Sequence, residues 1–356
     1  MTNYKNQHFI PRFYIKNFSN DGTIGIYNLK TKSSYRCSYR SICAKKYFYS
    51  KDTRLEQFFS ILEGMNSKAV AELIKLQDLN RLLPENRSVN LLSFITFQRS
   101  RANREKINSK RFVDYSTYIL KYMLDLESKH GKSRISKEKI QDIKISWDYH
   151  RFKMGYEICL GPLLISDLNQ CLFLNRTGHD FLFSDEPVVS YNACFNNIGY
   201  GTTGLQSPGL QIFCPLNKEL LLFLYDSRYY NLAGRDKIEI FNEEDIDSIN
   251  KLQFFNAHES LFFLADKEID IIQELHSKIE FLLEDGGNKM EMMSSDNEKE
   301  VSRLYGFSTP SINYDLKLSF INIISPRTTL VPRARSEEII QLSDILWDEI
   351  KPQWAK

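Results

Sequence analysis

The sequence predicts an α+β fold in which a basic, mainly helical N-terminal lobe packs on an acidic C-terminal lobe with mixed sheets. Hydrophobic residues make up 42% and charged residues 26% of the chain, which is typical of a folded protein. Apolar residues recur at helical spacing before residue 160, whereas short apolar runs separated by Gly, Asn, Pro and Thr follow it. Lysine and arginine outnumber aspartate and glutamate by 30 to 15 in residues 1–160, but residues 161–356 carry 17 against 30.

These changes predict four parts. Residues 1–160 form the basic lobe, a small sheet followed by helices, and residues 161–285 form the strand-rich acidic lobe. Residues 286–300 have almost no apolar periodicity and predict a mobile surface linker. Residues 301–356 add strands and a final helix that begins at Ser336. The charge split has two interpretations: the basic part faces an anion such as phosphate or nucleic acid, or it faces the acidic half of its own chain.

The basic lobe is expected to start with a small antiparallel sheet in residues 23–49, because β-branched and aromatic residues follow a turn signal. A long amphipathic helix is predicted over residues 54–76. A second helix is expected over 84–107 and a third over 113–127. A fourth covers 137–167 and is bent at its Gly-Pro step, because proline removes a helical hydrogen bond.

In the acidic lobe, short apolar runs predict buried strands at residues 171–175, 181–185, 188–192, 210–214 and 220–226. An acidic helix follows over 243–257, then a strand over 260–265 and a further helix over 268–285. Residues 317–325 are expected to hold one or two strands.

The segment QHFIPRFYIKNFS, residues 7–19, interleaves aromatic and polar side chains. A segment this rich in aromatic residues must pack, so Gln7, His8 and Arg12 are drawn to the interior or to a cleft wall, where each needs a partner. His8 is either a structural, hydrogen-bonded histidine or a catalytic or ligand-binding group, since the pKa of histidine lies near neutrality.

In the sequence FITFQRSRANR, Gln98, Arg101 and Arg104 follow one another at three-residue steps and are expected to share one helical face. Two guanidinium groups and an amide on one face suit a phosphate or a carboxylate. The arginines equally suit structural ion pairs with Glu56, Glu63 or the acidic half of the chain.

In the sequence GHDFLFSDEPVVS, a buried strand is expected to end beside Ser184, Asp185 and Glu186, because Pro187 cannot donate a hydrogen bond to a sheet. Polar groups at the end of a buried strand are a common position for active-site residues. They are equally a common turn signal, because Ser and Asp side chains bind the neighbouring backbone.

Taken together, the three phrases resemble the large uncharacterised bacterial family called domain of unknown function 4238. The resemblance covers most of residues 5–265 and implies a relative without implying a reaction. Ile15 stands where the family pattern has leucine. The matching positions are Gln7, His8, Pro11, Tyr14, Phe18, Gln98, Arg101, Arg104, Ser184, Asp185, Pro187 and Val188.

Other signals exclude common classes of protein. Gly199, Gly201 and Gly204 spell G-x-G-x-x-G, but the following LQSPG cannot open the helix that a dinucleotide site requires, so a lid or turn is the better interpretation. The six cysteines are spread singly and are expected to be reduced and mostly buried. No apolar run reaches the roughly 18 residues of a membrane span, and the N-terminus lacks the apolar core of a signal peptide, so we expect a cytoplasmic protein.

Two functions remain open. The first is an intracellular bacterial hydrolase that acts on a phosphate-bearing substrate, either a nuclease or a nucleotide hydrolase. A defence or toxin role would suit such an enzyme. Its expected catalytic residues are His8 as general acid or base, Arg101 as a phosphate clamp and Asp185. The candidate cofactor is a divalent metal such as Mg, which would be held by Asp185, Glu63 and Glu186. Substrate binding is assigned to Gln7, Arg12, Gln98, Arg104 and Ser184.

The second function is a non-catalytic binding protein. The same polar residues would then form a structural core, and the basic lobe would dock nucleic acid or an acidic protein partner. The sequence leaves the oligomeric state open. If His8, Gln98, Arg101 and Asp185 share one site, they must lie within hydrogen-bond reach of one substrate.

Overall fold

The computed structural model describes residues 6–51, 53–129, 135–146, 148–198, 201–234, 236–264, 266–282, 289–297, 300–308, 312, 314–324 and 333. Its helices and mixed sheets confirm the predicted α+β class.

A five-stranded sheet has the order β11-β5-β9-β8-β7. Neighbouring strands are antiparallel, except that β11 and β5 run parallel. Every residue of β8 and β9 is buried, which explains why these strands show no alternation of apolar and polar residues. The strands are β5 (Asn169–Asn175), β7 (Val189–Tyr191), β8 (Gln211–Pro215), β9 (Leu220–Tyr225) and β11 (Lys237–Ile240).

A second sheet joins the two halves of the sequence. Its order is β3-β2-β12-β6, with β2 (Thr23–Asn28), β3 (Ser33–Ser38), β6 (Phe183–Ser184) and β12 (Ser260–Phe263). Strand β2 pairs antiparallel with β12, so strands from both predicted lobes share this sheet. Two shorter pairs join β1 (Asn6–His8) to β4 (Ala44–Lys46) and β10 (Tyr230–Leu232) to β15 (Ile321–Ile323).

The helices of the N-terminal half differ from the predicted ones in two places. Arg101 and Ala102 separate two helices inside the predicted second helix, and the second of these continues as a single helix across the predicted third one. The predicted fourth helix is two helices, and its Gly-Pro step lies in the last turn of the second. The observed helices are α1 (Arg12–Lys16), α2 (Thr53–Leu76), α3 (Leu91–Ser100), α4 (Asn103–Lys129), α5 (Lys137–Asp142) and α6 (Tyr149–Leu164), with a π-helical turn at Asn86–Asn90 before α3.

The C-terminal half contains α7 (Glu243–Asn256) and α8 (Glu268–Ile279), as the sequence predicted. The segment for which a linker was expected contains β13 (Lys289–Asn297), which pairs antiparallel with β14 (Glu300–Ser308). The final helix predicted from Ser336 lies outside the described residues.

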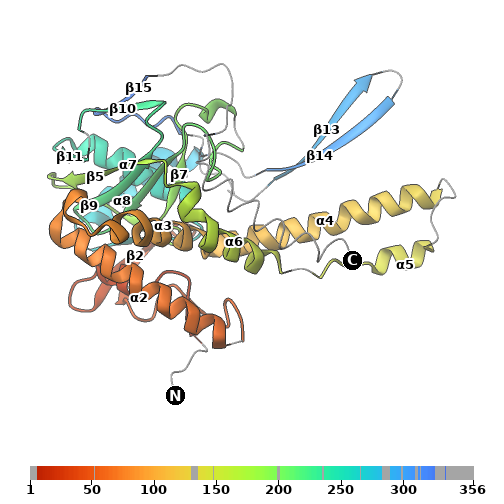
Figure 1. Cartoon of the computed structure of the whole chain (residues 1–356), viewed down its shortest axis with the longest axis horizontal. Coiled ribbons are helices and arrows are strands. Elements are labelled where there is room, and N and C mark those ends of the chain that lie inside the picture. Colours follow the sequence, from red (N-terminus) through yellow and green to blue (C-terminus); the bar gives the residue numbers. More distant parts are fainter. Residues whose placement is uncertain are drawn as a thin grey trace.

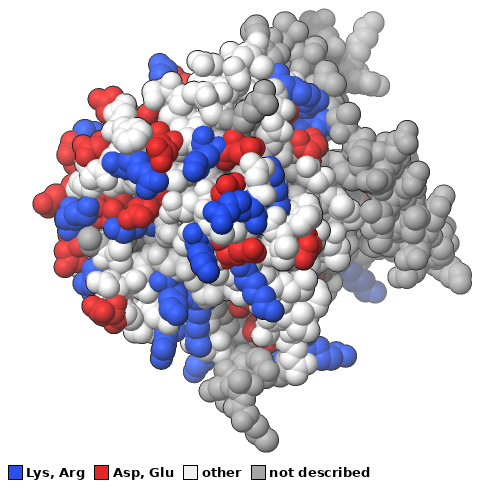
Figure 2. Space-filling view, turned by 60° about the vertical axis from the view of Figure 1, so that its left-hand side comes forward, with Lys and Arg blue, Asp and Glu red and all other residues white. Residues whose placement is uncertain are grey.

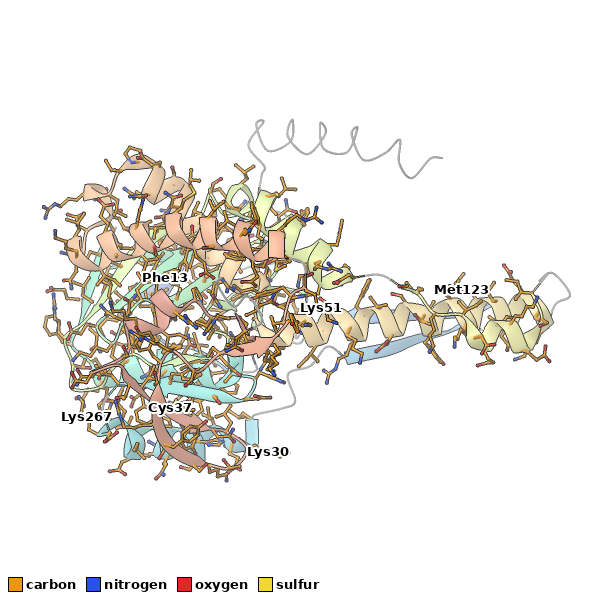
Figure 3. All side chains as sticks on the ribbon, turned by 90° about the horizontal axis from the view of Figure 1, so that it is seen from below. Phe13, Lys30, Cys37, Lys51, Met123 and Lys267 are labelled. Atoms are coloured by element: carbon orange, nitrogen blue, oxygen red, sulfur yellow. The ribbon has the colours of Figure 1, made fainter. Side chains whose placement is uncertain are left out.

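Figure 1 shows how these elements are arranged. The five-stranded and four-stranded sheets and α7 form the body together with α2, α3 and α6. The β13–β14 hairpin extends away from that body, and so does the outer part of α4, with α5 beside it. The same projection is visible from below in Figure 3, where Met123 lies on the extended part of α4. The N-terminal half of α4 therefore remains against the body, where α6 packs on it.

The N-terminal aromatic segment packs directly on β6, the strand that leads into the SDEP sequence. The ring of Phe18 lies 4.4 Å from that of Phe183, and the Phe183 ring stacks on Phe262 at 4.8 Å. Tyr14 meets Phe183 edge to face at 5.3 Å, and its hydroxyl donates to the carbonyl of Pro215 at 2.5 Å. All four rings are buried, so segments far apart in the sequence form one core.

Opposite charges from the two halves of the chain lie close together. Arg36 pairs with Asp266 at 2.8 Å, and Lys32 pairs with Glu280 at 2.6 Å. On the face shown in Figure 2, basic and acidic side chains are intermingled. These contacts favour the interpretation in which part of the basic half faces acidic groups of its own chain. Among the described residues, no helix combines the length and apolar composition needed to cross a membrane.

The first testable prediction concerns Gly25 in β2, which lies opposite Phe263 in β12. A Cβ atom at Gly25 would overlap the Phe263 ring, so Gly25→Ala should lower the free energy of unfolding by about 1–3 kcal/mol. Urea denaturation measures this change.

Gly64, inside α2, provides the matched control. A Cβ atom there meets nothing within 4 Å, so Gly64→Ala should raise the free energy of unfolding by about 0.5–1 kcal/mol. Equal effects of the two substitutions would contradict the packing of Phe263 over Gly25.

Candidate functional site

Gln7 holds strand β1 against the segment that follows β4. Its side-chain oxygen accepts hydrogen bonds from the backbone N–H groups of Tyr49 (2.7 Å) and Ser50 (3.3 Å). Its amide nitrogen donates to the carbonyl of Ser50 at 2.6 Å. Gln7 is 2% exposed, and buried backbone groups outside a sheet need such partners. The predicted substrate-binding residue therefore occupies a structural position.

His8 and Arg12 lie side by side at the end of β1. Nε of Arg12 donates to Nε2 of His8 at 3.2 Å, and the carbonyl of Arg40 lies 3.4 Å from the same ring nitrogen. Burial, followed by the charge of Arg12, lowers the pKa of His8, which favours a neutral ring at neutral pH. A neutral ring can accept the Arg12 hydrogen bond at Nε2. These two predicted site residues therefore meet.

Arg101 is buried at the end of α3 and bonds to three separate segments. Nη1 donates to Glu63 of α2 at 2.6 Å, Nε donates to the hydroxyl of Tyr49 at 2.9 Å, and Nη2 donates to the carbonyl of His8. The guanidinium also lies 4.6 Å from the centre of the Phe97 ring. Burial alone would lower the pKa of Arg101, but Tyr49 and Glu63 reverse that effect and raise it. The side chain is thus a charged, fully partnered group of the interior.

Gln98, Arg101 and Arg104 do not share one helical face, so that prediction is wrong. Helix α3 ends at Ser100 and α4 starts at Asn103, which turns the three side chains toward different partners. Gln98 donates to the carbonyl of Phe9 at 3.0 Å. Arg104 lies on the other side of the break, where its Nε is 3.6 Å from Glu186 and its Nη2 donates to the carbonyl of Ala257.

Ser184 and Asp185 tie β6 to α7 and to the loop that follows α7. The backbone N–H and the hydroxyl of Ser184 donate to the Gln253 side chain at 3.0 and 2.9 Å. The two carboxylate oxygens of Asp185 accept the backbone N–H groups of His258 (2.8 Å) and Glu259 (2.9 Å). Asp185 is buried, and desolvation raises its pKa although these two N–H groups oppose the rise.

The same helix α7 binds the backbone on both sides of β6. Asn250 accepts the N–H of Leu182 at 3.0 Å and donates to the carbonyl of Asp180 at 2.9 Å. Gln253 donates to the carbonyl of Pro187 at 3.1 Å, and Asn256 donates to that of Glu186 at 2.5 Å. Side-chain amides therefore replace a neighbouring strand along this segment.

Glu186 supports the first turn of α4. Its Oε1 accepts the backbone N–H of Arg104 at 2.9 Å, one of the N-terminal N–H groups that lack a partner within the helix. Burial raises the pKa of Glu186 to about 8, while Arg104 opposes this rise and Asp185 adds to it. The carboxyl group is therefore held near its titration point at neutral pH.

A network of hydrogen bonds and ion pairs links several of the predicted site residues through the interior of the protein. It runs from the carbonyl of His8 to Arg101, across the helix break to Arg104, and from there to Glu186 beside Asp185. Glu63 serves as the counter-ion of Arg101. Most of these contacts are made to backbone groups, so the network joins segments and does not itself form the wall of an open cleft.

A basic cavity of about 650 Å³ lies next to this network. Five cationic side chains and two acidic ones line it, together with a histidine, an asparagine and two apolar residues. The lining residues are Lys45, Lys46, Phe48, Asn103, Lys106, Ile107, Lys110, Arg111, Asp114, His258 and Glu259.

The network holds the walls of the basic cavity in place. Asp185 binds the backbone of His258 and Glu259 on one side, and Glu186 binds the start of α4 on the other. Across the cavity, Lys45 donates to the side chain of Asn103 at 3.1 Å.

Lys106 contacts Phe48, and both residues line the cavity. It donates to the carbonyl of Phe48 and lies 4.4 Å from the centre of the Phe48 ring. Burial lowers the pKa of Lys106, Asp148 opposes that change, and Lys45 adds to it.

Sequence reasoning missed the residues of this cavity. A signal existed, because Lys106, Lys110 and Arg111 recur at helical spacing and Lys45-Lys46 are adjacent in the sequence. The two groups lie more than fifty residues apart, and only the fold places β4 beside α4.

Two further predictions concern the described part of the chain. The sequence predicted a divalent-metal site at Asp185, Glu63 and Glu186, but the described residues contain no group of three or more His, Cys, Asp or Glu side chains that could hold a metal ion. Gly201 and Gly204 are followed by turns and then by β8, and not by the helix that a dinucleotide site requires. Gly199 lies outside the described residues.

The family model described as "Protein of unknown function (DUF4238)" matches residues 6–267. No curated protein and no solved structure matches the chain.

The structural role of Arg101 leads to a second prediction. Arg101→Lys keeps the charge but removes the planar group that reaches Glu63, Tyr49 and His8 together. We expect the free energy of unfolding to fall by about 2–4 kcal/mol, measured by urea denaturation. Arg12→Lys, on the exposed neighbour of His8, should change it by less than about 0.5 kcal/mol. An Arg101→Lys protein as stable as the parent would refute the interior role.

The raised pKa of Glu186 leads to a third prediction. The unfolded chain releases this proton near the ordinary pKa of 4.5, whereas the folded protein holds it until about pH 8. Stability should therefore fall as pH rises through this window, with a slope that approaches about 1.4 kcal/mol per pH unit. Glu186→Gln removes the titration but keeps an oxygen for the Arg104 N–H, so the slope should become shallower.

Denaturation at a series of pH values measures that slope. Glu239→Gln, which changes a carboxylate paired with Arg176 at the surface, is the control and should leave the slope unchanged. Identical pH profiles for the parent and Glu186→Gln would show that Glu186 titrates normally.

Proposed function

Because the chain belongs to the DUF4238 family, whose description names no activity, we propose a function from the geometry: the protein binds a phosphate-bearing ligand of nucleotide size in the basic cavity. The observation that carries this proposal is the excess of five cationic over two acidic side chains around a cavity of about 650 Å³. Concave sites of this volume are typical of small-molecule ligands. Clustered ammonium and guanidinium groups suit phosphate oxygens.

The other lining residues favour a ligand that is only partly charged. Phe48 and Ile107 supply apolar contact, and Asn103 at the start of α4 supplies a side-chain amide. A nucleotide combines phosphates with an aromatic base and hydrogen-bonding edges. Such a ligand uses both kinds of lining, whereas inorganic phosphate uses only the cations.

Hydrolysis of the bound phosphate is the first candidate activity, and His258 is the residue that supports it. The His258 side chain lines the cavity while its backbone is fixed by Asp185. In this proposal water attacks the phosphorus atom, the bond to the leaving oxygen breaks, and His258 accepts the proton of the water. His258 would take the role predicted for His8, and Lys106 that predicted for Arg101. A divalent metal such as Mg would have to enter with the substrate phosphates, since Asp114 and Glu259 are the two carboxylates among the lining residues.

A non-catalytic binding protein is the second candidate. The observation that favours it is that residues of the family pattern bind backbone groups, as structural residues do. These residues are Gln7, Gln98, Arg101 and Asp185. In this version these residues keep the walls of the cavity in place, and the cavity binds the ligand without breaking a bond in it. A cytoplasmic location fits both versions, because nucleotides and nucleic acids are abundant there.

The fourth prediction tests ligand binding. Lys46→Gln and Lys110→Gln each remove one exposed cation of the cavity and should weaken binding of a fluorescent nucleoside triphosphate by about tenfold, as measured by fluorescence anisotropy. Lys68→Gln removes the same charge from α2, away from the cavity, and should leave the affinity unchanged. Equal affinities for all four proteins would refute the site.

The same assay distinguishes the ligand class. If a single-stranded DNA binds more tightly than the nucleotide, and its affinity falls log-linearly with salt concentration, the ligand is a nucleic acid and not a nucleotide. Release of inorganic phosphate tests the activity: His258→Asn should retain nucleotide binding and lose release. If the parent binds the nucleotide without releasing phosphate at any metal concentration, the non-catalytic version is correct.

A further inference from the structure

A second cavity, of about 610 Å³, lies beside α6, and its lining residues all differ from those of the basic cavity. Arg99 in the last turn of α3 lines it, and so do Lys153 and Glu157 of α6 and part of the loop before β8. A cavity of this volume is large enough for a small molecule.

Contacts in the interior hold the walls of the second cavity in place. Nη2 of Arg333 donates to the carbonyls of Leu164 and Leu205, two residues that line the cavity. Arg333 is 6% exposed, so it ties the end of α6 to the loop before β8 from within. A Cβ atom at Gly161 of α6 would overlap Thr96 of α3, so these two helices are in direct contact. The cavity is therefore formed before any ligand arrives.

A buried ion pair supplies the polar part of the second cavity. Nη1 of Arg99 donates to Oε1 of Glu157 at 2.8 Å, and Nζ of Lys153 lies 3.8 Å from the same oxygen. Lys153 also pairs with Glu105 of α4. Two cations therefore face two carboxylates, whereas five cations and two carboxylates line the basic cavity. This balance of charge favours a neutral ligand.

The second carboxylate oxygen of Glu157 is buried without a donor. The Glu157 side chain is 5% exposed, and within the described part of the chain its Oε2 has no hydrogen-bond partner. A buried acceptor that lacks a partner costs free energy, because it has lost its hydrogen bonds to water and gained none in return. A ligand that brings an N–H group to Oε2 would offset this cost.

The rest of the lining suits an aromatic ring beside an amide group. Tyr156, which is 44% exposed, and the two leucines supply aromatic and apolar contact. Arg99 is 18% exposed, and its guanidinium carries five N–H groups, which leaves donors for a carbonyl oxygen next to Glu157. An amide presents a carbonyl and an N–H on one edge, so it matches Arg99 and Glu157 together.

We propose that the second cavity binds a neutral aromatic compound with an amide edge. Its N–H donates to Oε2 of Glu157, its carbonyl accepts from Arg99, and its ring lies against Tyr156. This site is separate from the basic cavity, and it does not depend on the function proposed for that cavity.

Benzamide is the probe for this site, titrated onto the full-length protein and followed by saturation-transfer NMR. N,N-dimethylbenzamide keeps the ring and the carbonyl but has no N–H, so it should bind about tenfold more weakly. Benzoate should also bind more weakly, because one of its charged oxygens would face Glu157. A nucleoside triphosphate should not displace benzamide. The proposal is overturned if benzamide does not bind, if it binds no better than its dimethyl derivative, or if the nucleotide displaces it.

Substitutions locate the bound probe. In Glu157→Gln the side-chain oxygen still accepts from Arg99, so an NH2 group replaces Oε2 and meets the N–H of the ligand. Affinity for benzamide should then fall about tenfold. Tyr156→Ala removes the ring contact and should weaken binding several-fold, whereas Tyr118→Ala, which removes a tyrosine that is 50% exposed on α4, should leave it unchanged.

Circular dichroism and urea denaturation check that the variants are folded. If Glu157→Gln does not fold, Tyr156→Ala and the comparison of benzamide with its dimethyl derivative still decide the matter, because neither disturbs the buried ion pair. Parent-like affinity for benzamide in folded Glu157→Gln and Tyr156→Ala would show that the probe binds elsewhere and would overturn the proposal.

Discussion

The buried guanidinium of Arg101 is the interaction on which the arrangement of the N-terminal half depends. A charge in the interior is tolerated only with partners, and Arg101 finds them on β1, on α2 and after β4. Satisfying all of them requires the side chain to point inward at the end of α3, with φ −92° and ψ −1° at this residue. The helix therefore ends there, and α4 starts in a new direction.

That new direction creates the candidate site. After the break, Arg104 reaches Glu186, and the next turns of α4 direct lysines toward β4 and His258. The buried residues and the residues that line the cavity thus have separate tasks. Those in the interior fix where the segments cross, and those that line the cavity surround the space proposed for a ligand.

Periodicity and strand chemistry were enough to predict the fold class, the buried strands and α2, α7 and α8, because each of these depends on local spacing of apolar residues. The break at Arg101 could not be predicted, since helical spacing continues across Ala102 and the partners that stop the helix lie far away in the sequence. The basic cavity was missed for a related reason: Lys45 and Lys106 meet only because β1 and β4 pair beside α4.

The side-chain amides of α7 have an effect beyond local hydrogen bonding. Strand β6 is the last strand of its sheet, where exposed backbone groups would invite pairing with another polypeptide. Asn250 and Gln253 occupy the N–H groups of Leu182 and Ser184, and so leave no template for an incoming strand. Helix α7 therefore prevents edge-to-edge aggregation at β6, a strand of only two residues.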